Sequence, residues 1–305
     1  MDGEGYLLLA TGPARYVELA RNLAASLRIM DGTRPICLVH DEEFEPGSGD
    51  DRLFDDYSLL PHDPAYPGFM NKIRLFGRTP YSRSMFVDAD CLLMKRDVDL
   101  WWRVARSHPF AIPGTPRRQG EWKGSDIGTL LRQEGAPFLV QMNSGVFSFD
   151  RSPTAARFFT GLVEFYERRR HALAVGLHRG CFAQTDEIYL GLWMGLCGMG
   201  PVTSRIGNDT WMNSTWRAFR FELCAIQGTS VMRKPMRSLA GIPNPIFGWD
   251  TLSPSFVHFV GLKPERHYQR LATQFRDAAA RLPLKRRAEG AYPWAERPAR
   301  MPQHA

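Results

Sequence analysis

An apolar run interrupted by two aspartates is the feature of this sequence that most restricts its fold. Residues Ser84 to Met94 read SMFVDADCLLM, with Asp88 and Asp90 where a buried strand would otherwise continue. Burying two carboxylates is costly unless a cation or hydrogen-bond donors compensate them. We therefore expect a strand over Met85–Val87 that stops at the aspartates. In a sheet of parallel strands such a stop lies at the carboxyl edge, where ligands bind.

The N-terminal part of the chain alternates between strand and helix signals. Tyr6–Ala10 is a short apolar run that ends in a Thr-Gly-Pro turn, and Pro35–His40 is a second apolar run. Between them, Tyr16–Leu27 carries apolar residues at helical spacing. A strand–helix–strand order predicts parallel strands joined by crossover helices, so we expect an α/β fold with a mostly parallel central sheet flanked by helices.

The rest of the chain extends this pattern without an internal repeat or a clear linker. Asp41–Asp56 is acidic and is expected to be a surface loop, whereas Gly114–Gly135 is polar, rich in glycine and expected to be a mobile loop. We expect one catalytic domain over residues 1–268, followed by a C-terminal helix and a basic tail over 269–305 that need not be ordered. Further helices are predicted over Asn71–Arg78, Thr154–Arg170 and Asp186–Leu196, and further strands over Val140–Phe149 and Phe256–Val260.

The charge of the chain restricts its partners. The 305 residues carry a formal net charge of +7, and the stretch from Lys263 to the end holds ten Lys/Arg against four Asp/Glu. Most of the excess is therefore local, and the nearly neutral body argues against a nucleic-acid groove across it. The basic tail is expected either to rest on anionic lipid at the membrane surface or to serve as plain solubilising charge.

The cysteines and the hydropathy of the chain indicate the cellular compartment in which the protein is expected. The five cysteines are widely spaced and form no CxxC pair, which is typical of buried small side chains in a reducing compartment. The acidic start MDGEGYLLLATG is unlike a signal peptide, and no apolar run is long enough to span a membrane. These patterns favour a soluble cytoplasmic protein.

The aspartate pair is suited to holding a metal ion. In an extended chain Asp88 and Asp90 point to the same side, so their oxygens can share one cation. Mg²⁺ and Mn²⁺ prefer carboxylate oxygens and keep open positions for phosphates. Two other interpretations stay open. One is a solvated turn or helix cap, and the other is a phosphatase with Asp88 as its nucleophile, although Leu92 departs from the pattern typical of such phosphatases.

Five motifs along the chain resemble those of one enzyme family. The segment NKIRLFGRTPYSRSMFVDADCLLM is similar to the central segment of GT-A-fold glycosyltransferases of the family that includes glycogenin and bacterial lipopolysaccharide galactosyltransferases. The resemblance runs from about Tyr6 to His267. Its motif residues are Lys72, about sixteen residues before Asp88; Asn143, Ser144 and Gly145 in QMNSGVFSFD; Asp186 in TDEIYL; Asn213; and His258, Gly261 and Lys263 in FVHFVGLKP.

Two of these motifs depart from the family pattern. Glu187 stands where the family has a glutamine, and only Leu262 separates Gly261 from Lys263 where two residues are usual. These departures motivate an alternative in which the chain is a degenerate member that binds sugar nucleotides without transferring them.

The resemblance implies a Rossmann-like GT-A fold and a metal-dependent transfer of a hexose from a nucleotide sugar, expected to be a UDP-sugar, with retention of anomeric configuration. Asp88, Asp90 and His258 would hold Mn²⁺ or Mg²⁺. The resemblance further places Ala89 between the two aspartates, Thr11 and Tyr16 at the base, Lys72, Asn143, Ser144 and Asp186 at the sugar and its phosphates, and Gly261 and Lys263 at the diphosphate.

Three of these residues, Asp186, Asn143 and Lys72, are the expected catalytic residues. Asp186 is expected to support the anomeric centre, orient a hydroxyl or attack. Because no second carboxylate is marked out as a hydrolase-type acid, front-face substitution is favoured, with the departing phosphate oxygen helping to deprotonate the acceptor. The acceptor is expected to be a glycan, a lipid-linked sugar or a small molecule. The aromatic residues Trp211, Trp216, Trp249 and Phe247 either stack on sugar faces or belong to the core.

Overall fold

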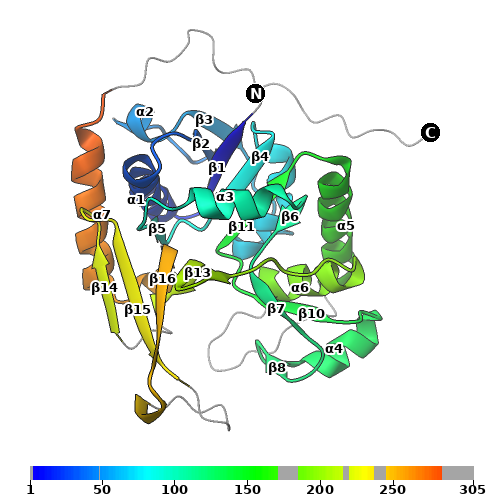
Figure 1. The fold of residues 1–305 in the computed structure, drawn as a ribbon. Coiled ribbons are helices and arrows are strands. Elements are labelled where there is room, and N and C mark those ends of the chain that lie inside the picture. Colours follow the sequence, from blue (N-terminus) through cyan, green and yellow to red (C-terminus); the bar gives the residue numbers. More distant parts are fainter. Residues whose placement is uncertain (1–2, 48, 171–184, 216–219, 237–244, 284–305) are drawn as a thin grey trace.

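The computed structural model describes residues 3–47, 49–170, 185–215, 220–236 and 245–283, and Figure 1 shows helices and strands arranged around a central sheet. This sheet has six strands in the order β3-β2-β1-β4-β11-β6. β1 pairs in parallel with β2 and β4, and β2 with β3, whereas β11 is antiparallel to β4 and β6. The bounds are β1 Glu4–Ala10, β2 Ile36–His40, β3 Asp56–Leu59, β4 Arg83–Val87, β6 Phe110–Ala111 and β11 Val146–Asp150.

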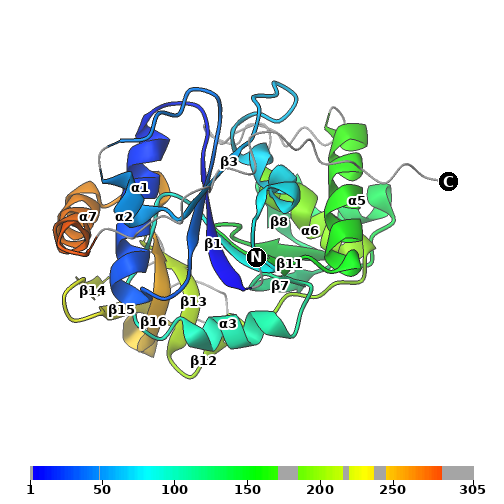
Figure 2. The same cartoon turned by 90° about the horizontal axis from the view of Figure 1, so that it is seen from above.

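Helices cover both faces of this sheet because its strands are apolar on both faces. Along β1, Tyr6 and Leu8 pack into one core and Leu7 into the other, as the period of two in an extended strand requires. Figure 2 shows α1 and α7 on one side and α5 and α6 on the other. The helices are α1 Arg15–Met30, α2 Asp50–Leu53, α3 Asp99–Arg106, α5 Pro153–Arg169, α6 Asp186–Leu196 and α7 Glu265–Ala280, with the 3₁₀ helix η1 at Gly68–Arg78.

A second sheet joins the first directly after the aspartates. Its strand order is β12-β13-β16-β15-β14, and the short strand β5 pairs with β16 so that Cys91 lies opposite His258. The sequence patterns predicted only the end of β16 and missed the strands before it. The bounds are β5 Cys91–Leu93, β12 Arg205–Ile206, β13 Asp209–Ser214, β14 Arg220–Cys224, β15 Thr229–Pro235 and β16 Trp249–His258, with 3₁₀ helices η3 Pro245–Phe247 and η4 Val260–Leu262.

The prediction of a mobile loop over Gly114–Gly135 was wrong, because this segment is folded. The Asp126 side chain accepts a hydrogen bond from the Thr129 amide and caps α4, and Gly135 ends that helix in the left-handed region at φ 69°. The polar composition reflects an exposed surface and not a missing structure. The elements are β7 Gly114–Arg117, which pairs with β10 Leu139–Met142, the hairpin of β8 Glu121–Trp122 and β9 Ser125–Asp126, and α4 Ile127–Glu134.

The single strand predicted over Val140–Phe149 is two strands with a turn between them. β10 ends at Met142 and β11 begins at Val146. Within the turn, the Gly145 amide donates to Asn143 Oδ1 at 2.9 Å, so the asparagine side chain stabilises the reversal. The turn brings residues 143–145 to the end of β4.

The remaining differences concern element boundaries. The predicted loop Asp41–Asp56 contains α2 and ends where β3 begins, and the predicted helix at Asn71 is a 3₁₀ helix. α7 begins at Glu265, so the expected domain boundary at 268/269 falls inside a helix that packs against α1.

Some predictions lie outside the described residues. These are the ones that concern the basic tail beyond residue 283, Trp216 and Cys181. Within the described part of the chain, no helix combines the length and the apolar character needed to cross a membrane.

Candidate active site

The two aspartates lie in a tight turn at the carboxyl end of β4. The Asp88 amide donates to the Gly145 carbonyl at 2.7 Å, and the Cys91 amide donates to the Asp88 carbonyl at 2.9 Å. Ala89 is buried between the aspartates. The strand stops at Val87, as the sequence predicts. Because the chain then turns, the carboxylates of Asp88 and Asp90 contact different partners.

The first set of contacts is named here the Lys72 group and consists of Lys72, Asp88, Ser144 and Asp186. The Lys72 ammonium donates to Asp88 Oδ2 at 2.9 Å and to Ser144 Oγ at 3.2 Å. It also lies 3.5 Å from Asp186 Oδ2, which accepts the Ser144 hydroxyl at 2.5 Å. η1, the turn after β4, the turn before β11 and the first turn of α6 thus each supply one residue.

Lys72 is the permanent cation of this group. It is only 6% exposed, and a buried lysine normally needs a paired charge. Burial alone would lower the pKa of Lys72, but the carboxylates of Asp186 and Asp88 raise it above its ordinary value. The ammonium therefore stays charged, and its single positive charge is shared by the two acidic side chains.

The second set of contacts, the His258 group, consists of Asp90, Cys91, Asn143 and His258. Asp90 Oδ1 lies 2.9 Å from His258 Nε2, and Asn143 Oδ1 lies 3.1 Å from His258 Nδ1. Since Asn143 Oδ1 already accepts from the Gly145 amide, His258 Nδ1 is the donor to it. Burial alone would lower the pKa of His258, but the Asp90 carboxylate raises it above its ordinary value.

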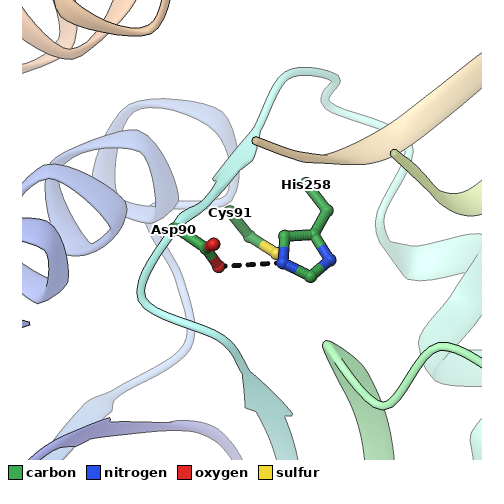
Figure 3. A group of neighbouring side chains, drawn as sticks. All are labelled: Asp90, Cys91 and His258. Carbon is green, nitrogen blue, oxygen red and sulfur yellow. Dashed lines mark ion pairs between the residues drawn. The ribbon is translucent and has the colours of Figure 1, made fainter. Parts of the chain in front are cut away.

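The donor atoms of the His258 group fit a divalent cation. A carboxylate oxygen of Asp90, Cys91 Sγ and a ring nitrogen of His258 all lie within 4.8 Å of one another. Figure 3 shows the Asp90 carboxylate and the Cys91 sulfur beside the imidazole ring. Carboxylate and imidazole are ordinary ligands of divalent metal ions. Asp88, the other aspartate predicted to bind the metal, lies against Lys72 instead and is not among these three residues.

Glu187 extends the Lys72 group toward the hairpin β8–β9. Its Oε1 accepts a long hydrogen bond of 3.4 Å from the Ser144 amide, and its Oε2 lies 3.0 Å from the Lys123 ammonium. Burial raises the pKa of the Glu187 carboxyl, and the Lys123 charge opposes this shift. Both acids at the start of α6 therefore contact Ser144, one through its hydroxyl and the other through its amide.

The residues predicted to bind the base lie at the ends of β1 and α1. Thr11 Oγ1 accepts from the side-chain Nδ2 of Asn71, the neighbour of Lys72, at 3.3 Å. The Arg15 guanidinium lies 5.0 Å from the centre of the Tyr16 ring and donates to its hydroxyl. Among the described residues, no hydrogen bond joins Thr11 or Tyr16 directly to the Lys72 or His258 groups.

The residues predicted to bind the diphosphate follow β16. The Thr215 hydroxyl donates to the carbonyls of His258 and Lys263 at 3.4 and 2.5 Å, which ties the segment after β16 to the His258 group. Gly261 and Leu262 both have left-handed backbone conformations, with φ of 62° and 60°. Asn213 lies on β13 and accepts from Lys234 at 2.9 Å.

Two of the aromatic residues considered for acceptor stacking have different environments. Trp211 is fully buried and stacks on Trp101 at 5.7 Å, so it belongs to the core. Trp249 is 37% exposed and lies under the Arg220 guanidinium at 5.3 Å.

The sequence patterns missed three residues that contact the site. Cys91 had been interpreted only as a buried small side chain, and Lys123 was hidden in a segment interpreted as a loop. Thr215 lies just after a strand that was not recognised. None of the three carried a local signal; Lys123-Gly124 in particular is not one of the dipeptides that mark a two-residue hairpin turn.

Comparisons with known proteins bear on the fold. No family model matches the chain, and no curated protein matches it in sequence. Among solved structures, the galactosyltransferase LgtC in complex with donor and acceptor sugar analogs is similar at 13% identity and a TM-score of 0.53, over 93% of this chain and 98% of that one.

Two further structures were also found. A glutamine-to-glutamate active-site mutant of LgtC is similar at 15% identity and the same TM-score, over 90% of this chain and 96% of that one. Mouse xyloside xylosyltransferase 1 in its apo form is similar at 14% identity and a TM-score of 0.41, over 71% and 89%. The chain therefore has the GT-A fold: a mixed α/β architecture with a central, mostly parallel sheet flanked by helices.

Proposed function

We propose that this chain is a glycosyltransferase that moves a hexose from a UDP-sugar to the hydroxyl of a glycan, lipid-linked or small-molecule acceptor, with retention of anomeric configuration. The observation that carries the proposal is the meeting of the Lys72 group and the His258 group at the carboxyl edge of the sheet, through the turns at Asp88 and Asn143. Residues far apart in sequence thus form one polar centre where α/β folds bind ligands. The likeness to LgtC, a galactosyltransferase, supports the same function.

A divalent cation, Mn²⁺ or Mg²⁺, belongs to this proposal. Asp90 and His258 would hold it; Asp88, the other predicted metal ligand, is paired with Lys72. When bound, the cation supplies Lewis-acid stabilisation of the departing diphosphate.

The leaving group needs positive charge from the protein as well. Breaking the bond between the anomeric carbon and the β-phosphate oxygen leaves a nucleoside diphosphate with one more negative charge. Lys72 is a fixed, dry cation at this edge, and such preorganised charge stabilises a transition state more than hydrated charge does. Lys263, exposed after η4, would be a second cation for the β-phosphate.

The acceptor reacts on the face from which the diphosphate leaves. A bond forms between the acceptor oxygen and the anomeric carbon, and the hydroxyl proton passes to the departing phosphate oxygen. Asp186 orients the sugar in this scheme, because its Oδ2 is already engaged by Ser144 and Lys72. The Oδ1 atom of Asn143 is likewise engaged, so its amide NH₂ group is the part that would donate to a sugar hydroxyl.

Thermal unfolding and product release together test the proposal. We expect UDP to stabilise the protein only with Mn²⁺, and we expect Mn²⁺-dependent UDP release from UDP-galactose or UDP-glucose. Stabilisation that ignores the metal would count against it.

A degenerate, binding-only protein is the second candidate. The left-handed Leu262 in the shortened segment between Gly261 and Lys263 favours it, because this backbone changes how Lys263 approaches a phosphate. Saturable UDP-sugar binding without UDP release would identify this case. Phosphate release from p-nitrophenyl phosphate, with an aspartyl-phosphate at Asp88, would instead identify a phosphatase.

A further inference from the structure

The turn of the hairpin β8–β9 holds a lysine in a strained conformation. Lys123 has φ 54° and the following Gly124 has φ 77°, so both central residues of this two-residue turn are left-handed. Glycine, asparagine and aspartate are the residues that such a turn prefers. The left-handed region disfavours a lysine, so this conformation has to be stabilised by contacts made elsewhere.

The contact that the Lys123 side chain makes is with the site. Its ammonium lies 3.0 Å from Glu187 Oε2, and the Glu187 side chain is 10% exposed whereas that of Lys123 is 38% exposed. The other oxygen of the same carboxylate faces the Ser144 amide. A line of contacts therefore runs from the hairpin through Glu187 to the turn that carries Asn143 and Ser144.

Charge explains why this contact is needed. Asp88, Asp186 and Glu187 place three carboxylates around Lys72, which contacts the first two directly. A third buried carboxylate requires its own cation or is driven to take up a proton. Among the described residues, Lys123 is the cation within ion-pair distance of Glu187.

We propose that Lys123 is a positioning residue of the transfer site: it holds the Glu187 carboxylate against the Ser144 amide and so fixes the turn that presents Asn143 and Ser144 to the donor sugar. The inference rests on the proposed function. The inference assigns a role in the reaction to the hairpin β8–β9, which lies outside the sequence motifs.

A double-mutant cycle tests this role. The variants are Lys123→Met, Glu187→Gln and the double variant, measured by Mn²⁺-dependent UDP release from UDP-galactose and by thermal unfolding. We expect Lys123→Met to lower kcat about tenfold with little change in the KM for donor, as pairs in contact are strongly coupled. In the Glu187→Gln background, which carries a neutral amide, the same substitution should change kcat and the melting temperature very little.

The control is Arg118→Met, an exposed cation on the same segment, which should match the wild type. Equal losses from Lys123→Met in both backgrounds would show a role independent of Glu187 and would overturn the inference while the proposed function stands. Wild-type activity in Lys123→Met would overturn it too. A wild-type protein that binds UDP-galactose but releases no UDP would remove the proposed function, and this inference with it.

Discussion

The Lys72 group and the His258 group begin at aspartates only two positions apart, yet they are built differently. The Lys72 group draws on η1, two turns at the edge of the central sheet and α6, and its carboxylates face a permanent cation. The His258 group spans two sheets, because His258 ends β16 while Asp90 follows β4. In it, a carboxylate faces an imidazole, which can exchange a proton for a metal ion.

The charges of the Lys72 group therefore stabilise the folded protein, whereas those of the His258 group are available to bind a ligand. Asp88 and Asp186 share the Lys72 ammonium before anything binds, so removing this partner should harm the folded state itself. The donor atoms of Asp90 and His258 face each other, so changing them should harm metal-dependent chemistry first. The substitutions below test that division.

The largest effect is expected from Lys72→Met. It leaves two buried carboxylates without their cation, and breaking a buried ion pair in this way costs about 3–5 kcal/mol of unfolding free energy. Urea denaturation measures the change, and UDP release should be lost as well. Arg103→Met, at an exposed position of α3, is the control and should shift the free energy by less than about 0.5 kcal/mol. A wild-type urea midpoint for Lys72→Met would contradict the inference that the charges of the Lys72 group stabilise the folded protein.

Asp90→Ala should have the next largest effect, and on activity alone. We expect the fold to persist, and Mn²⁺-dependent UDP release to fall by at least about 100-fold, as when a preorganised electrostatic contact is removed. Mn²⁺ should no longer increase the stabilisation by UDP in thermal unfolding. Asp277→Ala, an exposed acid on α7, should change neither measurement. Full activity in Asp90→Ala would refute the metal role.

Ser144→Ala should have an intermediate effect confined to the Lys72 group. Its hydroxyl donates to Asp186 and accepts from Lys72, and losing a hydrogen bond to charged groups costs about 2 kcal/mol. Ser148→Ala is a matched control, because Ser148 is equally buried and its Oγ has no hydrogen-bond partner among the described residues. The control should be neutral or stabilising in urea. Equal losses from both substitutions would mean that the Ser144 contacts add nothing.

The smallest effect on stability is expected from Gly145→Ala, which acts on the other group. A Cβ at this position would lie 2.9 Å from both Asn143 Oδ1 and His258 Nδ1, so it intrudes on the contact between them. We expect the free energy of unfolding to fall by about 1 kcal/mol and the stabilisation by UDP to depend less on Mn²⁺. The contacts of the Lys72 group should be unchanged. Gly77→Ala, whose Cβ would meet no atom within 4 Å, serves as its control. An unchanged Mn²⁺ response would show that metal binding does not depend on the position of His258.

The central sheet could be predicted from the sequence because its signals are local. Short apolar runs and helical spacing marked β1, α1 and β2, and the aspartates marked the end of β4. The helix α6 was predicted with its observed bounds, Asp186–Leu196. Each of these elements buries an apolar face that the residues themselves display.

The second sheet and the turn before β11 could not be predicted in this way. β14 alternates Phe221 and Leu223 with Arg220 and Glu222, so its apolar face consists of only two residues, and β15 places Val231 and Met232 next to each other without alternation. Their stability comes from pairing, of β14 with β15 and of β15 with β16, which is not a local property. Asn143–Gly145 was hidden because the apolar alternation continues on both sides of it. Contacts between residues far apart in sequence, such as Asp90 with His258, therefore needed the structure.

The strand β5 has only three residues, yet the His258 group can form only when this strand is paired correctly. A slip of its pairing with β16 by a single residue would turn His258 to the opposite face of the sheet. During synthesis, a chain that has emerged through α6 can already assemble the Lys72 group, whereas the histidine arrives only with β16. A chain that ends before β16, or that pairs β5 out of register, would therefore form the contacts of Lys72 but not the contact between Asp90 and His258.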